Sequence, residues 1–221
     1  MYYIDVVYYI DVIFYIAVVI LAFKYQEKFD EPVLKLLPYF FLIDLSLSLI
    51  TIIITKLFNS YNVWLINLIF AFELSFYFYF YYQLLKNKKY KKFTLIAGVI
   101  FAIYFITTFA LSENKNFYME KPFFTGTIFA IIIMMLYILD MLASDDFLYI
   151  HKHLIFWVTV AFLLYLVIPF PLSFWMSLFN KYGSESIGKA YLYIQTFANS
   201  MMYLTLIFGI LWSKKRSRLY S

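Results

Sequence analysis

Apolar residues in this chain come in seven long runs that are separated by short polar segments. About 20 mainly apolar residues in a helix cross the roughly 30 Å of bilayer hydrocarbon. The pattern therefore predicts an all-α, polytopic membrane protein with seven transmembrane helices, which form a single domain over residues 1–221. The seven runs cover residues 4–23, 34–54, 63–85, 93–111, 123–142, 154–174 and 187–212.

Prolines mark two places where the path of the chain should change. Pro122 precedes the fifth run and is expected at the first helical position, where its missing N–H costs nothing. Pro169 and Pro171 lie inside the sixth run, and proline removes a backbone donor and clashes with the preceding turn. We therefore expect the sixth helix to kink or stop there. Residues 172–178 then either complete the crossing or form a short helix in the interface.

Composition favours a bilayer, rather than water, as the solvent for most of the surface. Hydrophobic residues make up 65% of the chain and charged residues 14%, so too few polar side chains exist to cover a soluble core. The 24% aromatic content fits Tyr and Trp in the headgroup zone, and a coding bias explains it equally well. Cysteine is absent, which excludes disulfides and thiol nucleophiles. The N-terminus lacks the basic segment of a signal peptide, so the first run is expected to remain as a span.

Basic residues predict the orientation. With seven spans and the N-terminus outside, 13 of the 18 Lys and Arg fall on the cytoplasmic side and the other 5 outside, as the positive-inside rule requires. A six-span arrangement would instead put the two densest clusters, at 86–92 and 214–218, on opposite faces. The basic residues behind the formal net charge of +5 thus lie at the ends of the apolar runs. This position follows from membrane orientation and does not indicate nucleic-acid binding. We expect a multi-pass protein of the cytoplasmic (inner) membrane, with a cytoplasmic C-terminus whose basic residues anchor at anionic headgroups or dock a partner.

Acidic residues inside the runs are the first candidates for function, because a charge in hydrocarbon is costly. Asp44 and Glu73 lie at the middle of the second and third runs, and Asp11 lies outside the centre of the first. Asp140 lies near the cytoplasmic end of the fifth run, where it reaches the interface and needs no special explanation.

Uncharged polar residues extend these candidate positions along the helices. Ser48 follows Asp44 by four residues, and Gln195 and Asn199 are four apart in the last run, so each pair shares a helix face. We expect the polar faces of the second, third and seventh helices to meet, with Glu73 on the third, and to line a polar cavity that opens outward.

Two interpretations of this polar interior remain open. A lone carboxylate in hydrocarbon tends to be protonated, so acids and amides would act as hydrogen-bonded links between helices. Alternatively, Asp44 and Glu73, helped by Asn199, would hold a proton, a metal cation or a cationic ligand.

Motifs of known membrane chemistries are missing. The last run has no central lysine for a retinal Schiff base, since Lys189 lies at its outer end. The histidines, His151 and His153, lie in a connection beside Asp145 and Asp146, and we expect a solvated loop there rather than a metal site. Without a phosphate loop, a serine elbow or a nucleophile–base set, we expect neither an enzyme nor a cofactor.

Four segments make the chain resemble a set of uncharacterised bacterial seven-helix integral membrane proteins of about this length. They are residues 72–77 (FELSFY), the basic turn at 86–92, residues 137–140 (YILD) and residues 156–157 (FW). The resemblance extends over most of the chain and implies a membrane module that works beside separate signalling kinases.

The short connections leave no room for a soluble output domain, so the function is expected within the membrane. The first hypothesis is a sensing or signalling module that binds a small or lipidic ligand in the polar cavity and acts through a cytoplasmic partner. The second is a small transporter or a cation- or proton-conducting protein. The candidate binding residues are Asp44, Glu73, Asn199, Gln195, Ser48 and Asp11.

Overall fold

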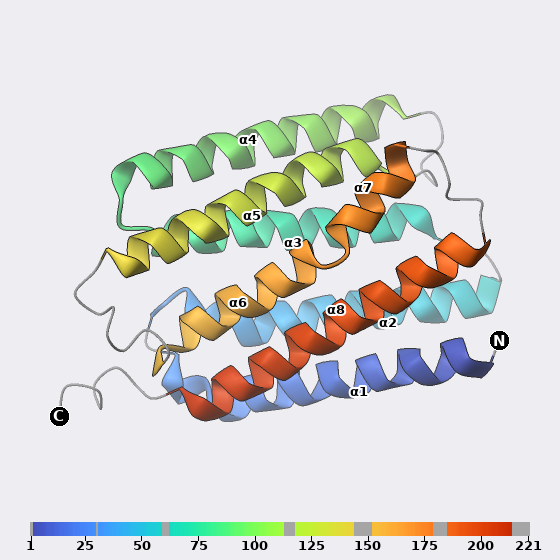
Figure 1. The fold of residues 1–221 in the computed structure, drawn as a ribbon, viewed down its shortest axis with the longest axis horizontal. Coiled ribbons are helices and arrows are strands. Elements are labelled where there is room, and N and C mark those ends of the chain that lie inside the picture. Colours follow the sequence, from blue (N-terminus) through green and yellow to red (C-terminus); the bar gives the residue numbers. More distant parts are fainter. Residues whose placement is uncertain are drawn as a thin grey trace. The chain divides into compact units, whose positions relative to one another are not determined.

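The computed structural model of the protein is all-α (Figure 1). It describes residues 2–29, 31–58, 62–112, 118–143, 152–178 and 185–213, and contains no strand within those ranges. The helices in chain order are α1 (Tyr2–Lys24), the 3₁₀ turns η1 (Gln26–Lys28) and η2 (Leu34–Leu36), α2 (Leu37–Phe58), α3 (Val63–Leu84), α4 (Lys88–Leu111), α5 (Glu120–Leu142), α6 (Leu154–Val167), α7 (Phe170–Leu178) and α8 (Glu185–Trp212).

Six helical segments in the described part of the chain are long and apolar enough to cross a membrane. This is the make-up of a multi-pass membrane protein, as the apolar runs predict. The first run is also helical, because α1 extends over 23 residues. The count of seven spans and the direction of crossing stay predictions. The six segments are Leu34–Phe58, Val63–Leu84, Lys88–Leu111, Glu120–Leu142, Leu154–Trp175 and Lys189–Trp212.

The prolines act as expected in the sixth run and slightly differently in the fifth. α6 ends at Val167 and α7 begins at Phe170, so the helix is interrupted beside Pro169. In the fifth run α5 begins at Glu120, which makes Pro122 its third residue rather than its first. The position is still compatible with proline, because the first four N–H groups of a helix have no intrahelical partner.

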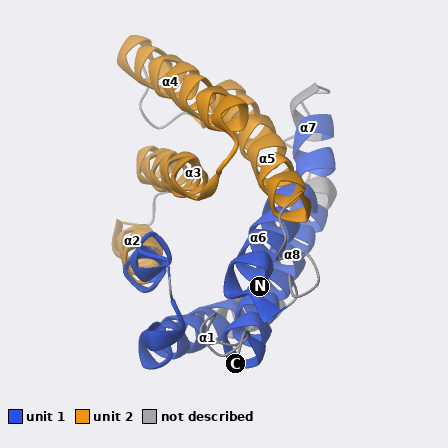
Figure 2. Cartoon of the chain, turned by 90° about the vertical axis from the view of Figure 1, so that its left-hand side faces the viewer, with its two compact units in different colours: residues 1–41, 145–221 blue, residues 42–144 orange. Residues whose placement is uncertain are grey.

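The chain divides into two compact units (Figure 2). Unit 1 consists of Met1–Phe41 and Asp145–Ser221, and unit 2 consists of Leu42–Ser144. The expectation of one seven-helix domain stays a prediction, and each unit is described by itself.

In unit 2, α5 packs against both α3 and α4, and α3 also packs against α4. Gly126 of α5 lies where the side chains of Leu74 and Phe101 converge, since a Cβ there would meet their carbons at 2.8 and 2.7 Å. Tyr81 and Tyr137 join α3 to α5, with ring centroids 5.4 Å apart. Aromatic side chains thus fill the space between helices, where lipid offers no hydrophobic driving force and close van der Waals packing must hold the bundle.

Two hydrogen-bonded contacts fix the ends of α5 in unit 2. Asn67, fully buried near the start of α3, accepts a hydrogen bond from the backbone N–H of Met119 at 3.2 Å. At the other end, Asp140 Oδ2 accepts from the N–H groups of Lys86 and Asn87 at 2.6 and 3.2 Å. Asp140 therefore has a defined role in the turn between α3 and α4. Its place at the end of α5 agrees with the expectation that it reaches the interface, and the contact with Lys86 and Asn87 is an addition to that expectation.

In unit 1, α8 packs against α6 on one side and α1 on the other. Gly209 allows a close approach of α8 to α6, because a Cβ on it would overlap the Cβ of Trp157. The Trp157 ring then meets Phe208 edge-on, with centroids 4.7 Å apart. A single glycine, rather than a pair spaced by four residues, makes this helix crossing possible.

Lys28 joins η1 to the C-terminal end of α8. Its Nζ donates to the carbonyl oxygens of Ile210 and Leu211 at 2.8 and 3.1 Å, which otherwise lack an intrahelical partner. The ammonium also lies 4.8 Å from the ring centroid of Tyr25. Burial lowers the pKa of Lys28 from its ordinary value, and the charge of Glu27 opposes that shift.

Gly209→Ala is expected to destabilise the protein by about 1–3 kcal/mol, the usual cost of overpacking. The added methyl group must push α8 away from Trp157. The thermal unfolding midpoint in detergent, measured against the parent, gives the effect.

Gly98→Ala is the matched control, because it makes the same substitution within a helix. A Cβ there would lie 3.4 Å from the Cβ of Phe78, with room to spare compared with Gly209. Equal midpoints for the two variants would contradict the close contact at Gly209.

Candidate intramembrane polar site

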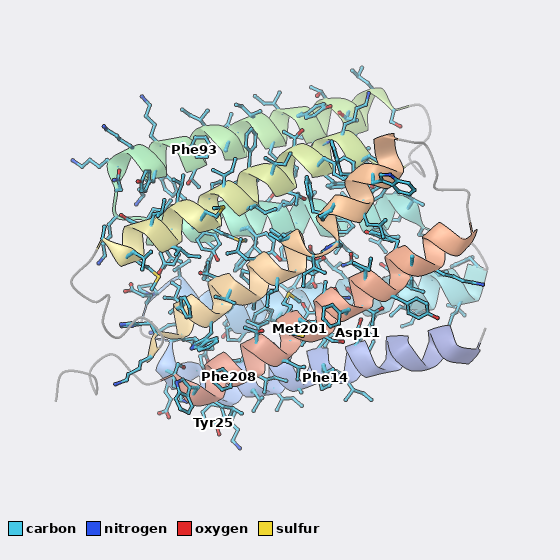
Figure 3. The ribbon with its side chains drawn as sticks, in the orientation of Figure 1. Asp11, Phe14, Tyr25, Phe93, Met201 and Phe208 are labelled. Atoms are coloured by element: carbon cyan, nitrogen blue, oxygen red, sulfur yellow. The ribbon has the colours of Figure 1, made fainter. Side chains whose placement is uncertain are left out.

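A buried acid in unit 1 contacts a group of polar side chains on a neighbouring helix. Asp11 of α1 is 8% exposed and shares its helix face with the buried residues Tyr15, Val18 and Ala22, which follow at intervals of four, three and four residues. This face packs against α8. Figure 3 labels Asp11 on α1 beside α8.

Hydrogen bonds connect Asp11 directly to two residues of α8, and to a third through one of them. Asn199 Nδ2 donates to Asp11 Oδ2 at 3.2 Å, and Ser200 Oγ lies 3.0 Å from Asp11 Oδ1. Gln195 Nε2 in turn donates to Asn199 Oδ1 at 3.2 Å. The chain of donors therefore runs from Gln195 through Asn199 to the carboxyl group, and both carboxyl oxygens have a partner. We call these four residues the Asp11 network.

An aromatic pair closes the seam one helical turn beyond the Asp11 network. Tyr15 follows Asp11 by four residues, and Tyr203 follows Asn199 by four. Their rings stack with centroids 4.8 Å apart, and both residues are buried. Phe41 meets the Tyr15 ring edge-on at 6.4 Å. The polar contacts of the Asp11 network are therefore followed, one helical turn along the same two helices, by an aromatic contact.

This arrangement suits reversible proton binding and the recognition of a small polar ligand. Asn199 must donate to Asp11, but the Ser200 hydroxyl can either donate or accept. The network thus accommodates both the ionised carboxylate and the protonated acid. A polar ligand that displaces one of the α8 side chains from Asp11 would find hydrogen-bond donors and acceptors in the remaining amide and hydroxyl groups. Among the described residues, no group of three or more His, Asp or Glu side chains is placed to hold a metal ion.

The structure brings together three of the predicted binding residues and places the other three in unit 2. Asp11, Gln195 and Asn199 belong to the Asp11 network. Asp44 and Glu73 are buried, with 7% and 8% of their surface exposed, and Ser48 is half-buried. The outward cavity expected from the second, third and seventh helices joins residues of both units, so it stays a prediction.

Other sequence candidates have different outcomes. Asp145, Asp146 and His151, which belong to the polar connection before α6, lie outside the described residues. Ser200 was absent from the predicted binding residues although it contacts Asp11 directly. Its position next to Asn199, at the same depth in the last run, is the signal that would have found it.

Comparison with protein-family models, curated proteins and solved structures finds no match. The fold by itself defines the class, which is a multi-pass α-helical membrane protein.

Asp11→Asn is expected to leave the stability nearly unchanged, because the amide reproduces the shape of the protonated acid. Its oxygen can accept from Asn199 and its NH₂ can donate to Ser200. Asp11→Leu removes both bonds and should destabilise by about 1–2 kcal/mol, in the range of interhelical hydrogen bonds in membranes. The unfolding midpoints of both variants in detergent provide the comparison.

If Asp11→Asn proves as damaging as Asp11→Leu, the negative charge itself holds α1 and α8 together. Ser200→Ala, which loses one of the two bonds, should fall between the parent and Asp11→Leu.

Proposed function

We propose that the protein is a membrane-embedded sensing module. A small or lipidic ligand binds at the Asp11 network, and α8 passes the resulting shift to a cytoplasmic partner. The observation that carries this proposal is the hydrogen-bonded contact of a buried acid, Asp11 of the predicted first span, with Asn199 and Ser200 of α8. Ionisable residues inside transmembrane segments are costly and mark functional sites by default.

The geometry of α8 supports the signalling step. α8 is one helix of 28 residues, and Asn199 lies about 16 Å along it from Ile210, at 1.5 Å per residue. The Lys28 ammonium holds the carbonyl of Ile210 at the far end. A ligand that replaces a partner of Asp11 would shift α8 against α1, and the helix would carry that shift to the Lys28 contact. The basic segment at 214–218 follows immediately in the sequence.

Transport of protons or cations is the second candidate function. Three buried acids, Asp11, Asp44 and Glu73, lie in helices that are otherwise apolar, and intramembrane acids form proton relays in pumps and transporters. Sensing and transport differ in one respect that can be measured. A transporter moves its ion across the bilayer, whereas a sensor only binds its ligand.

The sensing proposal predicts ligand-dependent stabilisation without ion flux. The purified protein would be screened by thermal unfolding against monovalent cations, organic amines and phospholipids. At least one class is expected to raise the midpoint of the parent, because binding to the folded state alone stabilises it. Asp11→Asn, which keeps the packing but removes the ionisable group, should lose that shift.

Proteoliposomes that contain the same variants would carry a pH-sensitive dye and then a sodium-sensitive dye. We expect no uptake by the parent under an imposed gradient. Uptake that disappears in Asp11→Asn would overturn sensing in favour of transport. A complete lack of ligand-dependent shifts in the parent would also count against sensing.

The proposed direction of signalling requires the C-terminal end of α8 to face the cytoplasm. A reporter active only in the cytoplasm, fused after Ser221, should therefore be active in cells. A second reporter, active only outside the cytoplasmic membrane and fused at the same position, should be silent. The reverse result would place the basic segment outside and exclude a cytoplasmic partner at that end.

A further inference from the structure

The turn between α3 and α4, together with the first residues of α4, carries a dense cluster of positive charge in unit 2. Four of its five lysines have exposed side chains, and the fifth, Lys91, is half-buried with its Nζ 4.8 Å from the ring centroid of Tyr82. We call this group the lysine cluster: Lys86, Lys88, Lys89, Lys91 and Lys92.

The lysine cluster is electrostatically unfavourable as it stands. α4 begins at Lys88 and has no acidic residue in its first turn, although the N-terminus of a helix carries partial positive charge and favours anions. Among the described residues, Asp140 is the acid that contacts this turn, through the N–H groups of Lys86 and Asn87. Five lysines and one aspartate leave a net charge of 5 − 1 = +4 at the turn. An anion bound there would relieve both the repulsion between the lysines and their conflict with the helix end.

The same helix presents a continuous apolar surface directly beyond the lysine cluster. α4 packs against α3 and α5 through its buried residues Thr94, Ala97 and Phe101. Its other side leaves large aliphatic side chains between 46% and 62% exposed. The apolar strip begins one turn after Lys92 and runs down the helix. Its members are Leu95, Ile96, Val99, Ile100, Ile103 and Ile106.

We propose that this side of α4 is a binding site for an anionic phospholipid. The lysine cluster holds the phosphate and the headgroup, while the acyl chains lie along the apolar strip. A lipid fits both parts at once, because its anionic group lies at the end of its hydrocarbon chains, as the lysines lie at the end of the strip. Basic residues near the membrane surface attract anionic lipids by about 1 kcal/mol each.

A lipid also fits better than a second copy of the chain. Two copies in one bilayer share their orientation, so α4 packed against α4 would bring the two lysine clusters to the same depth. Like charges would then face each other. A free phosphate ion would occupy the lysine cluster but leave the apolar strip unused.

The test uses native mass spectrometry of the full chain in detergent with equal amounts of phosphatidylglycerol and phosphatidylcholine. The spectrum reports both the bound lipids and the number of protein copies. One variant removes four charges of the cluster: K88Q, K89Q, K91Q and K92Q. A matched control removes four charges elsewhere in the chain: K24Q, K35Q, K115Q and K121Q.

We expect the parent and the matched control to retain phosphatidylglycerol in preference to phosphatidylcholine. The cluster variant should lose that preference by at least about fivefold, which corresponds to the contribution of one lysine. Lys89→Gln with Lys92→Gln removes two exposed charges, and it should give an intermediate preference even if the fourfold variant folds poorly. Excess soluble glycerol phosphate should not displace the lipid.

Four results would overturn the proposal. In the first, the parent retains both lipids equally, and in the second, the matched control loses as much preference as the cluster variant. In the third, glycerol phosphate displaces the lipid, and in the fourth, a protein dimer forms in place of the lipid complex.

Discussion

Hydrocarbon offers no hydrogen-bond partner, so every polar side chain within the spans must find one inside the protein or reach the interface. The Asp11 network follows from this constraint. An acid on α1 can be buried there only because α8 supplies an amide and a hydroxyl at the same depth. That requirement fixes the pairing of α1 with α8 and their relative register. Among the described residues, it also creates a group whose protonation or ligation would change how the two helices meet, and the proposed function depends on that change.

The helices themselves could be predicted because span length and hydropathy are local properties. The seven apolar runs coincide with helices of the structure, and Pro169 interrupts the sixth because the backbone chemistry of proline acts at its own position. The contact made by Asp140 could not be predicted, for the opposite reason. Its partners are backbone N–H groups more than fifty residues away in the sequence. No local pattern in either segment predicts that contact.

The composition of the candidate site was partly visible in the sequence, but the way its members pair was not. Gln195 and Asn199 form a helix face by their spacing alone, and Asp11 is conspicuous as an acid in an apolar run. Helical periodicity states which residues share a face but not which helix that face meets, so the hydrogen bond from Asn199 to Asp11 could not be predicted from the spacing. Gly209 was missed similarly, because a single glycine matters only once Trp157 lies opposite.

The two contacts at the ends of α5 restrict how unit 2 can move. Asn67 ties the start of α5 to the start of α3, and Asp140 ties the end of α5 to the residues that follow α3. The two helices run parallel and are fastened at both ends, so α5 cannot slide along α3 like a piston without breaking both contacts. Rotation about its own axis would likewise strain both. We therefore expect α3 and α5 to move together as one rigid pair, and the other helices of unit 2 to move relative to that pair.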